Sequence, residues 1–116
     1  MALHAGDASK PYVPQLQKIV NETPVYPDFQ RVGDDSIVLK DGRASLQRFF
    51  RTNAQFADIR KFYDATLAKA GWGPPQVPGP SIFGGESHYV SYHRDSYEFN
   101  VYENDGKVSI AVIWSN

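Results

Sequence analysis

The residues best suited to chemistry lie in the last third of the chain, where the spacing predicts a β-hairpin. If the chain turns at Asp95-Ser96, His93 faces Glu98, and Ser91 lies two residues away on the same face. A histidine that a carboxylate orients can act as a general base, and a nearby serine can act as a nucleophile. One interpretation is therefore a small hydrolase or isomerase that uses His93 and Glu98.

A second interpretation of the same face is non-enzymatic. The hairpin register also places Tyr89 opposite Tyr102. A flat sheet face holds no oxyanion donors and excludes no water, which argues against catalysis. A cross-strand His–Glu pair is most often part of a plain solvated face, but paired exposed tyrosines are typical contact residues. The functional hypothesis is a surface for a protein partner or a small ligand, formed by Tyr89, His93, Glu98 and Tyr102.

A proline- and glycine-rich stretch over residues 73–86 precedes this hairpin. Prolines and glycines at this density interrupt both helices and β-ladders, so the stretch is predicted to be a loop. A long loop in a small domain is either a mobile connector or a functional segment. In the functional interpretation, Ile82 and Phe83 act as a lid or extend the contact surface.

The residue pattern favours no metal, cofactor or nucleic-acid site. The chain has no cysteine. His88 and His93 are five residues apart in one predicted strand and therefore point to opposite faces. The glycine pairs lack the strand–turn–helix context of a phosphate cradle. A formal net charge of −1, without a run of either sign, lacks the basic patch of a nucleic-acid-binding protein.

Two turns predict the sheet that carries this face. A turn at Asp105-Gly106 adds a third strand to the hairpin, and both turns select the same apolar face. That face carries Val90, Tyr92, Tyr97, Phe99, Val101, Val108, Ile110, Val112 and Trp114. This alternation is typical of a half-buried antiparallel sheet.

One amphipathic helix is predicted over about 53 to 70, and the rest of the chain is organised around it. Thr52 or Asn53 suits its N-terminus, and Gly71 suits its C-terminal cap. Its apolar residues recur at helical spacing. They are Phe56, Ile59, Phe62, Tyr63, Leu67 and Ala70.

An earlier hairpin is predicted around Asp41-Gly42, because this dipeptide favours two-residue turns in which both central residues have positive φ. Its register places Ile37 opposite Leu46. Before it, residues 1–23 form a flexible or partly helical lead-in, of which residues 1–12 are expected to be disordered. Within residues 14–24, a helix and an irregular segment are both compatible with the pattern.

The length of 116 residues and 41% hydrophobic content predict one domain with a real core, over residues 24–116. No apolar run has the length of a membrane span, and the first residues do not resemble a signal peptide. We expect no transmembrane segment in this chain. The oligomeric state is left open.

Four segments resemble a pattern in small uncharacterised bacterial domains, many of them lipoproteins or membrane-tethered envelope proteins. The segments are residues 25–29 (Val-Tyr-Pro-Asp-Phe), 50–54 (Phe-Arg-Thr-Asn-Ala), 59–63 (Ile-Arg-Lys-Phe-Tyr) and 67–72 (Leu-Ala-Lys-Ala-Gly-Trp). The resemblance covers about residues 24 to 72 and implies a periplasmic or envelope location. It brings no catalytic residues, and this chain lacks the lipidated cysteine of such proteins.

These patterns predict an α+β domain in the order β-β-α-β-β-β, with an antiparallel sheet of four to five strands and one long helix on one face. The predicted function is a non-enzymatic binding module, associated with the bacterial envelope. The alternatives are the hydrolase or isomerase described above and a structural domain within a larger assembly.

Overall fold

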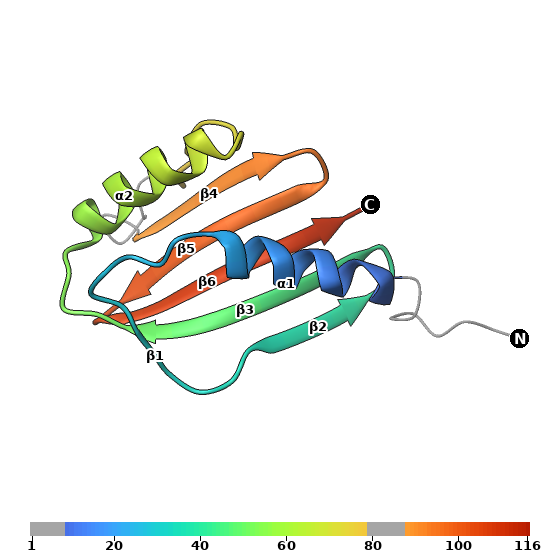
Figure 1. The fold of residues 1–116 in the computed structure, drawn as a ribbon, viewed down its shortest axis with the longest axis horizontal. Coiled ribbons are helices and arrows are strands. Elements are labelled where there is room, and N and C mark those ends of the chain that lie inside the picture. The colour runs from blue at the N-terminus through green and yellow to red at the C-terminus, as the bar shows by residue number, and fades with distance from the viewer. Residues whose placement is uncertain (1–8, 79–87) are drawn as a thin grey trace, which may run out of the picture.

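The computed structural model describes residues 9–78 and 88–116. These residues form an α+β fold in which one antiparallel sheet of six strands carries two α-helices (Figure 1). In chain order the elements are a 3-10 turn (Lys10–Tyr12), α1 (Val13–Glu22), β1 (Gln30–Arg31), β2 (Ser36–Lys40), β3 (Arg43–Arg51), α2 (Phe56–Lys69), β4 (Tyr89–Arg94), β5 (Tyr97–Asn104) and β6 (Lys107–Ser115).

The sheet has the strand order β1-β3-β6-β5-β4, and β2 also pairs with β3. The long strand β3 therefore has two short strands along one edge, with β1 near its C-terminal end and β2 near its N-terminal end. The predicted α+β class and antiparallel sheet are confirmed. The predicted numbers of strands, four to five, and of helices, one, were too low, because β1 was missed and α1 was left undecided.

The C-terminal hairpins have the predicted registers. Tyr92 pairs with Phe99 and His93 with Glu98 across the first turn, and Phe99 pairs with Val112 across the second. The backbone at Asp95, Asp105 and Gly106 has positive φ, which these tight turns require. The predicted apolar face is buried, apart from Tyr97 and Trp114, which are partly buried.

The hairpin β2–β3 also has the predicted register, with Ile37 opposite Leu46. Its turn differs in one respect, because only Gly42 has positive φ (75°) and Asp41 does not. The buried Ser9 also fastens this hairpin, since its hydroxyl donates to the carbonyl of Lys40 and accepts from the N–H of Arg43.

The helix α2 is confirmed, although it is shorter than predicted. Its N-cap is Gln55, with no side-chain cap, so the predicted cap at Thr52 or Asn53 was wrong. The C-terminal prediction is correct. Gly71 has φ of 87°, its N–H donates to the carbonyl of Ala68, and the N–H of Trp72 donates to the carbonyl of Leu67. This pair of bonds is a Schellman cap.

The N-terminal lead-in contains a regular helix, α1, packed on the sheet over β3 and β6. Leu16, Ile19 and Val20 are all buried there. Tyr12 stacks on Trp114 with 3.5 Å between ring centroids. The prediction of disorder was therefore wrong for residues 9–12, while residues 1–8 lie outside the described part. Contact with the sheet, which local sequence does not reveal, decides in favour of a helix.

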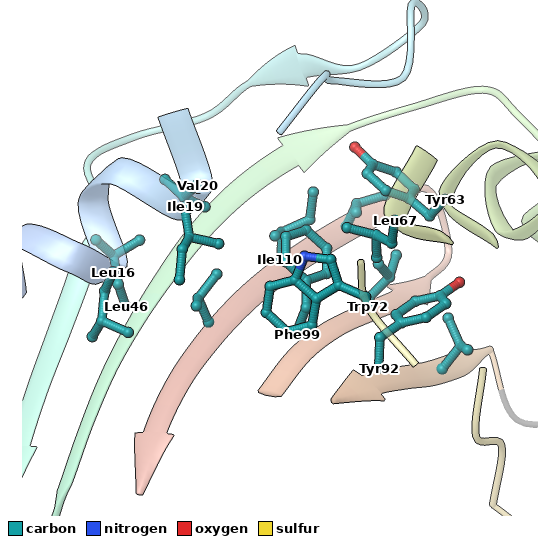
Figure 2. Close-up of a cluster of buried hydrophobic side chains, with 14 of the residues drawn as sticks. Leu16, Ile19, Val20, Leu46, Tyr63, Leu67, Trp72, Tyr92, Phe99 and Ile110 are labelled. Carbon is teal, nitrogen blue, oxygen red and sulfur yellow. The ribbon is translucent and has the colours of Figure 1, made fainter. Parts of the chain in front are cut away.

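Both helices cover the same face of the sheet and share one core (Figure 2). Tyr63 of α2 packs on Phe99 of β5, and Trp72 meets Phe99 edge to face. Burial raises the pKa of Tyr63 to about 12. The hydroxyl of Tyr92 donates to Asp64 and so joins β4 to α2. The predicted stripe is core at Ile59, Tyr63 and Leu67, and Phe56 and Phe62 are partly buried against it. Ala70 was wrongly included, because it is exposed just after the helix ends.

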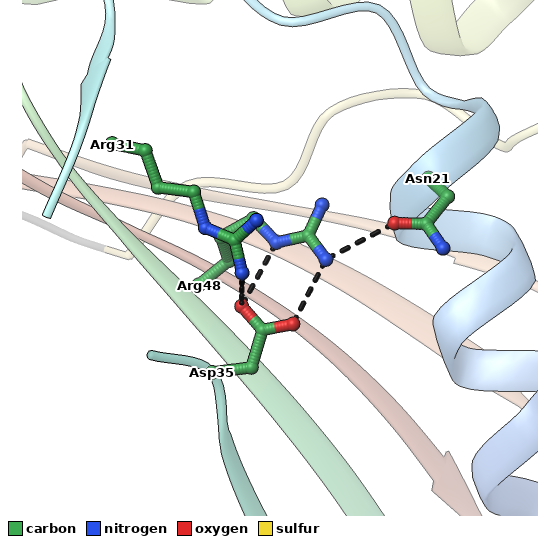
Figure 3. Close-up of polar contacts among 4 residues, drawn as sticks. All are labelled: Asn21, Arg31, Asp35 and Arg48. Atoms are coloured by element: carbon green, nitrogen blue, oxygen red, sulfur yellow. Dashed lines mark hydrogen bonds and ion pairs between the residues drawn. The ribbon is translucent and has the colours of Figure 1, made fainter. Parts of the chain in front are cut away.

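A charged cluster fixes the chain between β1 and β2 (Figure 3). The Arg48 guanidinium donates two hydrogen bonds to Asp35, of 2.9 and 2.8 Å, and a third to Asn21 of α1. Arg31 also donates to Asp35. These bonds lower the pKa of the Asp35 carboxyl, chiefly through Arg48. The cluster therefore joins α1, the β1–β2 connection and β3.

Candidate functional site

The face of the sheet opposite the two helices is called the outer face here. Its side chains come from alternate positions of the paired strands, as the registers require. On β4, β5, β6 and β3 they are Tyr89, Ser91, His93, Glu98, Asn100, Tyr102, Asn104, Lys107, Ser109, Ala111, Ile113, Ser115, Arg43, Ser45, Gln47, Phe49 and Arg51. No helix of the described residues lies on this face (Figure 1).

His93 and Glu98 meet at one end of the outer face, as the sequence predicts. The His93 Nε2 and a Glu98 carboxylate oxygen are 2.8 Å apart. The other oxygen of Glu98 accepts a bond of 2.9 Å from the Asn100 side-chain amide. The carboxylate therefore holds both neighbours in fixed orientations. The Asn100 side-chain oxygen is buried and accepts no hydrogen bond from the described residues.

Tyr89 and Tyr102 lie directly opposite each other across β4 and β5, also as predicted. Tyr102 is 46% exposed, whereas Tyr89 is partly buried. The pKa of Tyr89 is raised, first by burial and second by the negative charge of Glu98. Ser91 and Asn100 are buried in the neighbouring row. The tyrosine pair and the His–Glu pair thus flank a closely packed polar centre.

The remaining two predicted site residues, Ile82 and Phe83, lie outside the described residues. The start of the Pro/Gly stretch is described, and it runs along the edge of β4. The Gly73 N–H donates to the carbonyl of His93, and Gln76 and Ser91 exchange two backbone hydrogen bonds. The stretch was expected to form no β-ladder, and this single bridge is its only pairing within residues 73–78.

A shallow cleft of about 240 Å³ adjoins the His93–Glu98 pair. Arg43, Ser96 and Ser115 also line it. A histidine in contact with a carboxylate can accept a proton from a bound group. The lining residues also present hydrogen-bonding groups to the cleft.

A second His–Glu pair was not predicted from the sequence. His88 Nδ1 lies 2.6 Å from Glu103, whose other oxygen accepts from the Gly106 N–H. Phe56 of α2 stacks on the His88 ring. Extending the β4–β5 register by one residue places His88 opposite Glu103, so the signal was available. The buried carboxylate and the stacked ring make this pair a structural link between α2 and the β5–β6 turn.

A polar cleft at the opposite end of the sheet was also missed. It has a volume of about 440 Å³ and lies where β1, β3 and the β5–β6 turn meet. Asp28 accepts hydrogen bonds there from the Thr52 hydroxyl and the Asn53 N–H. These two residues were predicted to cap α2. Their pairing with Asp28 depends on the tertiary path of residues 23–29, which no local pattern specifies.

Within residues 9–78 and 88–116, no group of three or more histidine, aspartate or glutamate side chains is placed to hold a metal ion. In the same part of the chain, no helix has the length and apolar character needed to cross a membrane. No protein-family model, curated protein or solved structure matches the chain. The function proposed below is therefore inferred from the geometry of the molecule.

Proposed function

We propose that the protein is a binding module that contacts a protein partner through the outer face of its sheet. The observation that carries the proposal is the half-exposed Tyr102, placed beside Tyr89 on the face that the helices leave open. Tyrosine supplies a large contact area at a low entropic cost, and it is enriched at the centres of interfaces.

The shape of the outer face favours a protein over a small molecule. Sites for small ligands are concave and bury most of the ligand. Here the centre of the face, at Ser91, Asn100 and Ala111, is already buried. The Glu98 carboxylate holds His93 and Asn100 in place, so the polar groups around the tyrosines are preorganised. Preorganisation reduces the entropic cost of association.

The test is capture of a partner from an extract of the source cells, comparing the wild type with Tyr102→Ala. If Tyr102 is a central contact, the recovered partner falls at least tenfold, since truncation of such a residue costs about 2 kcal/mol. Tyr89→Ala is expected to reduce capture less, because Tyr89 is partly buried. Quantitative mass spectrometry of the captured protein measures both effects.

Val25→Ala is the matched control. Val25 is 44% exposed, but it lies between α1 and β1 and borders the helix-covered side of the sheet, not the outer face. Its substitution is expected to leave capture unchanged. Unaltered capture by Tyr102→Ala, or equal loss with Val25→Ala, contradicts the proposal. The envelope location that the resemblance implies stays a separate prediction.

A further inference from the structure

Two cationic side chains lie next to each other at one end of the outer face. Arg51 of β3 and Lys107 of β6 are directly opposite across the ladder. The next pair along this ladder is Thr52 and Gly106. It is a hydrogen-bonded pair, because the Thr52 N–H donates to the carbonyl of Gly106. Because the two kinds of pair alternate, Arg51 and Lys107 form a non-hydrogen-bonded pair, whose side chains are closer together. Like charges in this position destabilise a sheet.

Within the described residues, neither Arg51 nor Lys107 forms an ion pair, because no carboxylate lies within ion-pairing distance of either side chain. Arg48, three residues earlier on the same strand, shows the usual arrangement, because Asp35 binds its guanidinium through both oxygens. No direct ion pair among the described residues therefore offsets the repulsion between Arg51 and Lys107.

The two cations border the 440 Å³ cleft, together with Gln30 and two carboxylates, Asp28 and Asp105. One oxygen of Asp28 already accepts bonds from Asn53 and Thr52, which lower the pKa of this carboxyl. Asp28 and Asp105 thus place two carboxylates in the same cleft as the two cations. The lining therefore favours an anion of single charge, since a dianion would be repelled more strongly by the two aspartates.

We propose that the cleft beside Arg51 and Lys107 binds a carboxylate group. The planar Arg51 guanidinium matches a carboxylate with two parallel hydrogen bonds, and Lys107 adds a point charge from the neighbouring strand. Gln30, opposite Arg51 on β1, can donate a further bond. The carboxylate belongs either to a small organic acid or to the C-terminus of a polypeptide. This site uses different residues from the tyrosine surface and stands or falls independently of it.

The experiment is a titration followed by amide chemical shifts in the full chain. The probes are acetate, N-acetylalanine, which mimics a polypeptide C-terminus, N-acetylalanine amide, which lacks the charge, and inorganic phosphate. We expect both carboxylates to shift the amides of Arg51, Thr52 and Lys107, with saturation below about 100 mM. Tighter binding of N-acetylalanine than of acetate identifies the polypeptide terminus as the source. The reverse order identifies a small acid.

Arg51→Gln and Lys107→Gln are each expected to weaken binding about tenfold, because each removes a charged hydrogen-bond donor. Both residues are exposed, so the variants retain the fold, which the dispersion of the same spectra verifies. Arg43→Gln is the matched control. Arg43 is an exposed arginine on the same strand and face, opposite Lys40, but it lies outside this cleft.

Four results overturn the proposal. They are an absence of saturable shifts, equal shifts with the uncharged amide, equal weakening by Arg43→Gln, and tighter binding of phosphate than of either carboxylate. The third result would indicate diffuse electrostatic attraction in place of a site. The fourth would show that the two aspartates do not select for a single charge.

Discussion

At the scale of single residues, the role of a charged side chain depends on whether the fold supplies an oppositely charged partner. Arg48 and Asp35 neutralise each other in a half-buried setting, with side-chain exposures of 14% and 20%. Removal of one partner leaves the other charge poorly solvated, which is the costly event for such pairs. The adjacent Asp34 is exposed and forms no ion pair with the described residues.

Asp35→Asn is predicted to lower the free energy of unfolding by about 1.5 kcal/mol at neutral pH, because Arg48 loses a charge-assisted bidentate contact. The pKa of Asp35 is lower in the folded than in the unfolded chain. Its stabilising contribution is therefore full above the ordinary pKa of 3.8 and is lost as the pH falls through the lower folded value.

Urea unfolding at a series of pH values checks this prediction. The difference between the wild type and Asp35→Asn is expected to shrink below about pH 4. Asp34→Asn serves as the control and should match the wild type at every pH. A difference that stays constant down to pH 2, or that grows on acidification, would be inconsistent with the ion pair as its cause.

At the scale of elements, the C-terminal end of α2 combines several stabilising features. Gly71 adopts a left-handed conformation in the Schellman cap, and Arg94 of β4 donates to the carbonyl of Ala70. The Arg94 guanidinium also lies 4.5 Å from the centre of the Trp72 ring. The cation therefore stabilises the negative end of the helix dipole while it covers an aromatic ring.

Gly71→Ala is predicted to destabilise the protein by about 1 kcal/mol, since an L-residue is strained at φ of 87°. The added Cβ itself meets only Arg94, at 3.9 Å, which is ordinary contact. Gly71→Asn should cost less, because asparagine tolerates this conformation better. Thermal unfolding of the three proteins gives the order, and a larger loss for asparagine would refute the conformational explanation.

The elements defined by local signals were predictable from the sequence. The β4–β5 and β5–β6 registers follow from the turn dipeptides and from the alternation of apolar and polar residues. A slip of one residue would move the apolar side chains to the wrong face. Gly71 marked the end of α2 for the same kind of local reason. The outer-face pairs His93–Glu98 and Tyr89–Tyr102 depend only on the first of these turns, so they too were predicted correctly.

What depends on distant contacts was missed. The pairing of β3 with β6 joins segments on either side of α2, and no turn specifies its register. The Arg51–Lys107 neighbourhood therefore could not be inferred. Similarly, Thr52 has the residue type of a helix cap, but its hydroxyl binds Asp28 instead. Local propensity is overridden where tertiary partners compete for the same group.

At the scale of the whole molecule, the two helices depend on a single core. Leu16 of α1 is fully buried, and Trp114 reports on that end through its stack with Tyr12. Trp72 reports on the other end, beneath α2. A domain with one continuous core is expected to unfold in one cooperative transition.

Leu16→Ala is predicted to destabilise the protein by about 3 kcal/mol, as expected for a buried leucine. Single-tryptophan variants, Trp72→Phe and Trp114→Phe, allow each end to be followed by fluorescence. Leu16→Ala should lower both unfolding midpoints by the same amount. Gln17→Ala, an exposed neighbour on α1, should lower neither. If only the Trp114 signal shifts, α1 separates from the sheet on its own and the single-core description is wrong.

The way the sheet ends bears on the behaviour of the protein in concentrated solution. Along the edge strand β4, Gly73 and Gln76 form hydrogen bonds with backbone groups that would otherwise be unpaired. At the other side, β1 has two residues and β2 has five, with Lys40 at the end of β2. Short edge strands with charged residues offer few backbone groups for pairing with a strand of another chain. Natural β proteins resist fibril growth in this way. Although Ile37 and Val38 are both exposed there, we expect the protein to stay dispersed rather than polymerise strand by strand.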